Sequence, residues 1–511
     1  MSPFPWTRKT TLALVFAVLG ALLTLPFRVH AYFDATNDAA VYILTAQALL
    51  GGNGYTYLGA PFTLRPPGFP VVLAPILGTA GLDFRALNLT VSLFGLLSVA
   101  LFFVWLQARL GTAVALALSA ALWLNPGFER LSTQVMSDVP GAALMILCLL
   151  AERRARHNPS SAADVLLGLS IALAAYFRTV FVLFLPAVLL FRWLAWRGER
   201  GAKPTLARFA LRRLAIPAGV TLLLLLPWSV RNAVVVTGAP AEHTWNYSYW
   251  VSLLHEDRGD PASPAVSLSE LRRTVKRRVG EILTGLGGRM LSDEPSLPRT
   301  VLGIAICLCW LAAFWRRREP AEIFTALLFI VMALYYSNRP RLVLPLYLLV
   351  APAAAELAIV GLRRAAAART AHGIAAGLIL LVAVLDMAPS ADREEIARGH
   401  RRLADLAAHI AESFPPGAPL AAESGAIYAV HMGRPVYSFG PVCRRLGLEG
   451  FIGYIRRHGV RGLILSPASD EPCGLETYLA DHAVIDDSFG PLLIARLHDL
   501  PGPRVGTGEA R

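Results

Sequence analysis

The chain has 511 residues and is too apolar for a single soluble domain. Hydrophobic residues make up 55% of it, charged residues only 16%, and the mean hydropathy is +0.51. These values exclude an ordinary water-soluble protein and are typical of polytopic membrane proteins. The formal net charge of +13 does not indicate nucleic-acid binding, because the basic residues concentrate in alternate short loops between apolar segments.

Apolar segments of membrane-crossing length recur along residues 1–388. A spanning helix needs about 20 apolar residues, and somewhat fewer when it packs among other helices. We therefore predict a polytopic α-helical membrane protein with about eleven spans, at most about 13. The predicted spans are residues 10–30, 84–107, 111–125, 137–151, 162–177, 179–196, 211–229, 299–315, 320–336, 341–361 and 371–388.

Basic clusters in the connecting loops predict how these spans are oriented. Clusters precede the first span and follow the fourth, sixth, eighth and tenth spans. By the positive-inside rule all these loops are cytoplasmic, so the amino terminus lies inside and the carboxyl terminus outside. The first apolar run has no small-residue cleavage site, and we interpret it as a retained span. The sequence thus predicts a multi-pass protein of a bacterial-type cytoplasmic membrane.

Two kinds of polar segment interrupt or follow this membrane module. Residues 31–83 and 231–298 form its large outer loops, with amphipathic helices in the first of them. Residues 389–511 begin with a charged helical stretch and then alternate strands with helices, which predicts a small extracytoplasmic α/β domain with a disordered tail. The predicted strands are 418–421, 435–438, 461–466, 483–487 and 492–497, and the helices are 447–458 and 474–481. Cys443 and Cys473 in this domain could pair in an oxidising compartment.

Several ionisable residues fall at span ends on the predicted outer side. A charge at that depth costs free energy unless it is paired or hydrated, so each is a functional hypothesis. Tyrosines and an asparagine near them are candidates for lining a substrate. The ionisable residues are Asp38, Arg65, Asp138, Arg178, Arg231, Arg339 and Arg341, and the lining candidates are Tyr42, Tyr55, Tyr57 and Asn232.

The two aspartates each have a structural and a functional interpretation. Asp38 opens the helical run AAVYILTAQALL, which is amphipathic enough to lie on a membrane surface. Asp138, in MSDVP, opens a span. Capping of a helix N-terminus competes with a functional role at both positions. A carboxylate at Asp38 could also accept a proton from a substrate hydroxyl as a general base.

The arginines suit a phosphate ligand. Arg65 precedes the rigid turn Pro66-Pro67-Gly68, and its competing interpretation is snorkelling to lipid phosphates. Arg178 lies in a tight outer turn, Arg231 and Asn232 end the seventh span, and Arg339 and Arg341 open the tenth. Arginine binds phosphate in a bidentate manner, which a diphosphate or phosphodiester ligand can use.

Other chemistries find little support in the sequence. His243, His255, Glu256 and Asp257 could form a metal site, but their spacing matches no known ligand pattern, and solvated loop residues are the stronger interpretation. We assign no metal ligands and no cofactor, and leave a divalent metal open. The sequence has no Walker motif, GxSxG, HExxH or CxxC, so nucleotide-driven transport is not supported.

Several motifs resemble those of a known family. The segments NDAAVY, LLGGNGY, RPPGFPVVLAP, SDVP, PWSVRN and RPRLVLPLYLL occur in this order over the first 350 residues. In them the chain resembles clan C integral-membrane glycosyltransferases of the protein O-mannosyltransferase and lipid A aminoarabinose transferase group. The C-terminal domain resembles the extracytoplasmic tail of some of these enzymes.

The resemblance implies a particular reaction. A sugar would move from a polyprenyl phosphate to an acceptor on the outer side, with inversion at the anomeric carbon. Asp38 would be the base and Asp138 a second acidic residue that orients donor or acceptor. Arg65 stands where aminoarabinose transferases carry a lysine before two prolines, which keeps the charge but leaves the donor headgroup undetermined.

From these observations we expect an inverting glycosyltransferase whose acceptor is a glycolipid, polysaccharide or protein. Its partners would be the lipid-linked donor, the acceptor and membrane lipid, but no nucleic acid. The main alternative is a transporter or flippase of lipid-linked sugars. Such a protein should place ionisable groups near the bilayer midplane and contain paired broken helices, whereas here the charges sit at one face. A structural partner of a cell-envelope complex would not explain the arginines.

Overall fold

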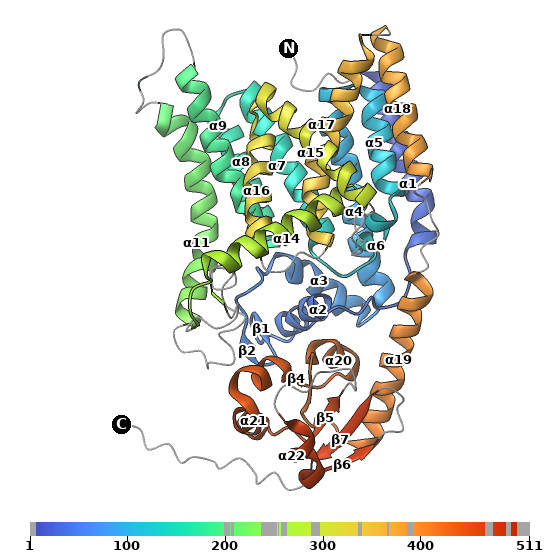
Figure 1. Ribbon diagram of the computed structural model, residues 1–511, viewed down its shortest axis with the longest axis vertical. Helices are drawn as coiled ribbons and strands as arrows, with labels where there is room; N and C mark the ends of the chain where they lie inside the picture. Colours follow the sequence, from blue (N-terminus) through green and yellow to red (C-terminus); the bar gives the residue numbers. More distant parts are fainter. Residues whose placement is uncertain are drawn as a thin grey trace. The chain divides into compact units, whose positions relative to one another are not determined.

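The structure is a computed structural model (Figure 1). It describes the chain apart from residues 1–6, 199–204, 206–208, 237–252, 254, 257–262, 288–296, 336–339, 365–366, 386–391, 466–473, 487–491 and 498–511. The chain divides into two compact units. The first comprises Met1–Ala31, Thr63–Val72 and Asp83–Ser390, and the second comprises Tyr32–Phe62, Leu73–Leu82 and Ala391–Arg511.

The first unit is a bundle of apolar helices. Within the described residues, six helical segments are long and apolar enough to cross a membrane, and shorter apolar helices accompany them. Each predicted span corresponds to a helix, which confirms the predicted fold class. The helices are α1 (Arg8–Arg28), α4 (Phe84–Leu110), α5 (Thr112–Leu124), α6 (Pro126–Ser132), α7 (Asp138–His157), α8 (Ser161–Phe177), α9 (Phe184–Gly198), α11 (Ile216–Val236), α14 (Leu268–Leu286), α15 (Leu297–Arg317), α16 (Pro320–Leu334), α17 (Leu344–Leu362) and α18 (Ala368–Leu385).

Short irregular segments join several of these helices. They are the 3-10 turns η1 (Thr179–Leu183) and η3 (Pro340–Val343) and the π-helical turn η2 (Ala210–Ala215). The predicted end of the seventh span was wrong, because α11 continues through Arg231 and Asn232 to Val236. The PWSVRN segment is therefore helical, and its Pro227 lies inside the helix.

Small residues fix the contacts of α4 with α6 and with α7, the helix that begins at Asp138. A Cβ added to Gly95 of α4 would lie 2.9 Å from the Ser132 hydroxyl oxygen. The Ser92 hydroxyl donates to the Ser132 carbonyl (2.8 Å), and the Ser98 hydroxyl donates to the Val139 carbonyl (3.3 Å). Small and hydroxylated residues let membrane helices approach closely in this way. They hold the start of α7 in one position on α4.

The second unit contains a mixed sheet with strand order β4-β3-β5-β7-β6. β3 is parallel to β4 and β5, whereas β7 is antiparallel to β5 and β6. The predicted strands and helices of this region are present, but α20 was not predicted. The elements are β3 (Leu420–Ala422), β4 (Val436–Ser438), β5 (Gly462–Leu465), β6 (Ala483–Asp486), β7 (Leu493–Leu497), α19 (Asp392–Ser413), α20 (Gly425–Met432), α21 (Gly440–Arg457) and α22 (Leu475–His482).

The segment after the first span belongs to this second unit. It forms α2 (Asn37–Leu50) and the hairpin of β1 (Thr56–Tyr57) with β2 (Ala60–Pro61). α2 packs against α20, and Leu44 and Leu58 pack against the core of the α/β domain. Part of the apolar surface of α2 therefore packs on the α/β domain. Cys443 is disulfide-bonded, and Cys473, its predicted partner, lies outside the described residues.

Candidate active site

The first turn of α7 holds a buried ion pair. Asp138 is only 1% exposed, and its Oδ1 accepts from Nη1 of Arg178. The helix N-cap is Ser137, whose side chain makes no capping hydrogen bond. The Asp138 carboxylate binds Arg178, and Ser137 rather than Asp138 is the N-cap residue. The ion pair therefore explains the aspartate better than helix capping does. Its other oxygen, Oδ2, is buried and accepts no hydrogen bond from the described part of the chain.

Arg178 is held in place by the local chain path. It is the C-cap residue of α8, in extended conformation, and η1 follows directly. The side chain lies over Gly141 of α7, where an added Cβ would be 2.9 Å from Cδ of Arg178 and 2.8 Å from Phe181. The side chain remains 18% exposed. A guanidinium has five N–H donors, so an arginine can bind a carboxylate and a second acceptor at the same time.

Arg341 lies beside the same turn. Its Nη1 is 3.6 Å from the Met136 sulfur, two residues before Asp138. Arg341 belongs to η3, which precedes α17. Packing of the helices thus brings Asp138, Arg178 and Arg341 to one end of the bundle. Arg339, the other predicted residue of this segment, lies outside the described residues.

The segment that carries Arg65 packs against the end of α8. It leads into α3 (Gly68–Ala80), and a Cβ on Gly68 would lie 2.5 Å from the carbonyl oxygen of Tyr176. The rings of Phe69 and Phe177 are 6.5 Å apart. Because Phe177 immediately precedes Arg178, the turn after Arg65 is fixed next to the ion pair. Only a glycine allows this approach of two backbones.

Arg231 and Asn232 lie together on α11. Nη1 of Arg231 donates to the Asn232 side-chain oxygen (3.0 Å), and the guanidinium stacks on Trp228, 5.2 Å from the ring centre. The Asn232 amide in turn donates to the Thr63 carbonyl (3.4 Å). Thr63 is two residues before Arg65, so α11 anchors the same segment. Asn232 therefore has a positioning contact that the sequence did not predict.

The remaining predicted residues belong to the second unit. Asp38 lies in the first turn of α2, whose N-cap is Thr36; the Thr36 hydroxyl accepts from the Ala39 N–H. The N-cap residue is therefore Thr36, and Asp38 is the acidic residue of the first turn. The Asn37 side-chain oxygen accepts from the Ser424 hydroxyl (3.2 Å), which ties this turn to the start of α20.

The three predicted lining tyrosines are also in this unit. Tyr42 and Tyr55 are buried, at 5% and 8% exposure. Tyr57 is half-buried and lies in the β1–β2 hairpin. The Phe62 ring lies 6.0 Å from that of Tyr55 and 5.9 Å from that of Tyr57. Packing against Phe62 therefore explains why the Tyr55 ring is buried and why the Tyr57 ring is partly buried.

The described residues contain no group of three or more histidine, cysteine or acidic side chains placed to hold a metal ion. Of the candidates in the large loop, His243 and Asp257 lie outside those residues. The His255 ring nitrogen Nδ1 is 2.7 Å from the Ser263 carbonyl, a contact within the loop itself. The residues present therefore suggest no ligand set, and no chemical step is assigned to a metal.

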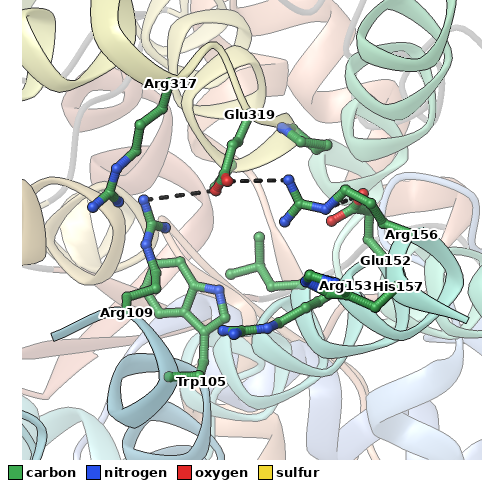
Figure 2. Close-up of a pocket in the computed structure, with 12 residues that line it drawn as sticks. Trp105, Arg109, Glu152, Arg153, Arg156, His157, Arg317 and Glu319 are labelled. Atoms are coloured by element: carbon green, nitrogen blue, oxygen red, sulfur yellow. Dashed lines mark hydrogen bonds and ion pairs between the residues drawn. The ribbon is translucent and has the colours of Figure 1, made fainter. Parts of the chain in front are cut away.

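A second charged cluster surrounds a pocket of about 350 Å³ at the opposite end of α7 (Figure 2). Its charged lining consists of Arg109, Glu152, Arg153, Arg156, Arg317 and Glu319. In Figure 2, Glu319 lies between Arg109 and Arg156, with nitrogen–oxygen distances of 3.9 and 3.0 Å. Burial tends to raise the pKa of Glu319, but Arg156 and Arg109 outweigh it and lower the pKa below its usual value.

This pocket is close to neutral in charge. Arg109 also binds Glu322 (2.7 Å), Arg156 also approaches Glu152 (3.7 Å), and Arg317 pairs with Glu356. Four glutamates thus offset the arginines that line it. The network joins the ends of α4, α7, α15, α16 and α17, and we interpret it as structural. From the sequence these arginines were interpreted as loop charges, and their pairing with glutamates 163 and 213 residues away was not predicted.

Comparisons with known proteins identify the fold. No family model and no curated protein sequence match the chain. ArnT from Cupriavidus metallidurans bound to undecaprenyl phosphate matches with a TM-score of 0.59 and 16% identity, over 96% of this chain and 99% of that one. Its apo state gives 0.57 and 15% identity, over 94% and 97%.

A more distant match is the archaeal oligosaccharyltransferase AglB from Archaeoglobus fulgidus, solved with an inhibitory peptide and a dolichol-phosphate. Its TM-score is 0.55 at 14% identity, over 90% of this chain and 69% of that one. The chain therefore has the fold of ArnT and of this archaeal oligosaccharyltransferase. The resemblance inferred from the six sequence motifs is confirmed at the level of the fold.

Proposed function

We propose that this protein is an inverting membrane glycosyltransferase that uses a sugar carried on a polyprenyl phosphate. The observation that carries the proposal is the buried Asp138–Arg178 pair with Arg341 beside it, at one end of a bundle of this fold. Solved proteins of the same fold bind undecaprenyl phosphate and dolichol-phosphate. Arginines held at a fixed position suit the phosphate of such a carrier.

The reaction assigns a distinct task to each group. The acceptor hydroxyl oxygen attacks the anomeric carbon while the bond from that carbon to the phosphate oxygen breaks. Asp38 accepts the hydroxyl proton, and the polyprenyl phosphate leaves with the electron pair. Arg178, Arg341 and Arg65 stabilise the growing negative charge, an effect commonly worth about 3–4 kcal/mol per well-placed donor.

In this mechanism Asp138 is a positioning residue. Its carboxylate fixes the Arg178 guanidinium, and its second oxygen is available to accept from a hydroxyl of the donor or acceptor. Arg231 and Asn232 stabilise the segment that presents Arg65. Arg339 would add a further cation before the tenth span. Tyr42, Tyr55 and Tyr57 are proposed to contact substrate on the side of Asp38.

We further propose that transfer takes place on the outer face of a bacterial-type inner membrane. The basic loops then lie inside, and the domain of residues 389–511 lies outside with the acceptor, which would be a glycolipid, polysaccharide or protein. A structure of the archaeal oligosaccharyltransferase contains zinc and sulfate. Metal dependence is therefore best tested directly, by transfer assays with and without a chelator.

The decisive experiment compares Asp38→Asn with wild type in a strain that lacks the endogenous gene. Mass spectrometry of envelope glycolipids, polysaccharides and proteins should detect a sugar that is present with wild type and absent with the variant. Asp405→Asn, a change on α19, serves as the control and should restore transfer. Near-normal transfer by Asp38→Asn would refute the base assignment.

A second experiment, with the protein in liposomes, distinguishes sugar transfer from transport. A flippase moves a lipid-linked sugar across the membrane without changing it covalently. In liposomes that contain the protein and a fluorescent lipid-linked sugar, a glycosyltransferase should release polyprenyl phosphate when acceptor is added. Movement across the bilayer without that release would favour the flippase.

A further inference from the structure

The helix α14 carries a row of exposed basic side chains. Arg272, Arg273, Lys276 and Arg277 are all exposed, and they stand at positions i, i+1, i+4 and i+5. Residues at this spacing lie on one face of a helix. The helix begins at Ser267, whose hydroxyl caps the Glu270 N–H, so the row lies within the first three turns.

The opposite face of α14 is fixed to the bundle. Thr274, Arg278 and Ile282 are buried on that side, and the helix packs against α15, α16 and η3. Val343 of η3 lies 3.2 Å from where a Cβ on Gly285 would be. α14 runs across the bundle rather than along it (Figure 1). The basic face therefore points away from the bundle, and packing of the other face prevents the helix from rotating to bury it.

This basic face has almost no acidic partner. Arg277 is 4.0 Å from Glu281, a carboxylate that also binds the buried Arg278. Arg272, Arg273 and Lys276 form no ion pair with any residue that the structure describes. Like charges at i and i+4 repel each other and destabilise a helix. An anionic surface against this face would remove that repulsion.

An exposed apolar residue extends the same face. Leu268, four positions before Arg272, is 82% exposed. A leucine in line with long basic side chains is typical of helices at a membrane interface, where the aliphatic stems lie in the apolar region and the charges reach the phosphates. A solvated basic face or a site for an acidic peptide would not need the leucine.

We propose that this face of α14, formed by Leu268, Arg272, Arg273, Lys276 and Arg277, docks on the headgroups of anionic phospholipids. The phosphodiester charges offset the four cations, and Leu268 inserts among the acyl chains. Since η3 also contains Arg341, the docked helix lies at the end of the bundle that holds the candidate site. The inference concerns lipid contact alone and does not depend on sugar transfer.

Hydrogen exchange of the full chain in lipid nanodiscs tests this proposal. The discs contain phosphatidylcholine alone or phosphatidylcholine mixed with phosphatidylglycerol. Backbone amides of residues 268–277 should exchange several-fold more slowly with the anionic lipid, and added salt should remove the difference because it screens exposed charges. Equal exchange in both lipids at low salt would overturn the proposal.

A matched pair of triple variants locates the effect. R272Q/R273Q/K276Q should lose the lipid dependence, whereas R398Q/R401Q/R402Q on α19 should keep it. An equal loss in both variants would assign the effect to net charge and overturn the proposal. Protection by a soluble polyglutamate peptide but not by anionic lipid would also overturn it and identify a protein partner. The salt series on wild type provides a test even if a variant fails to fold.

Discussion

Replacing Asp138 by asparagine tests the ion pair at the start of α7. The substitution keeps the shape of the side chain but removes its charge, so the Arg178 guanidinium loses its counter-ion. Removing one partner of a buried ion pair typically costs about 3–5 kcal/mol. Arg178 is 18% exposed and can be partly hydrated, so we expect the lower value, about 3 kcal/mol, for the loss in unfolding free energy.

A double-mutant cycle isolates the interaction from other effects of each change. Arg178→Ala alone leaves the Asp138 carboxylate buried and unpaired, and it should cost a similar amount. The double variant should lose less than the sum, with a coupling free energy of about 2–3 kcal/mol. Denaturation in mixed micelles, monitored by tryptophan fluorescence, gives the four values. Additive losses would refute the conclusion that the pair stabilises the fold.

The functional part of the prediction needs a control of equal instability. Arg178→Ala should reduce the transfer rate about 10²–10³-fold, because it removes a donor to the leaving phosphate. Glu322→Gln breaks the comparable ion pair with Arg109 at the other end of the bundle. It should destabilise the protein to a similar extent but leave binding of undecaprenyl phosphate unchanged. Equal losses of undecaprenyl phosphate binding in Arg178→Ala and Glu322→Gln would show that general destabilisation, and not the loss of a phosphate contact, lowers the activity.

Three further changes test other parts of the structure. Gly68→Ala places a Cβ 2.5 Å from the Tyr176 carbonyl, so transfer assays should show a loss of activity although no charge is removed. Gly141→Val should release the Arg178 side chain and lower undecaprenyl phosphate binding, measured by thermal shift. Burial, together with His400, lowers the pKa of His431 to about 4. The neutral ring is therefore favoured in the fold, and stability that is complete above about pH 6.5 should fall as the pH approaches 4. Hydrogen exchange of residues 425–432 should record this loss, and His431→Gln should abolish it.

The pattern of apolar residues along the sequence was sufficient to predict most of the fold. Spans follow from length and composition, because a helix in lipid must satisfy its own backbone hydrogen bonds. The strands of the C-terminal domain follow from short apolar runs between turn residues. One boundary was wrong where a proline occurs within a helix: the predicted seventh span stopped at residue 229, just after Pro227, whereas α11 continues to Val236.

The sequence also indicated which ionisable residues matter, because charges at the ends of apolar spans need a reason to be there. It did not reveal their partners. Asp138 and Arg178 are 40 residues apart in sequence, and Met136 and Arg341 are 205 apart. Glycines allow the close approach around the first of these contacts, because Gly141 lies against the Arg178 side chain and Gly68 against the Tyr176 backbone. Local sequence preference specifies a helix and its apolar face, whereas close packing in three dimensions decides which helix ends meet and therefore which charges form a site.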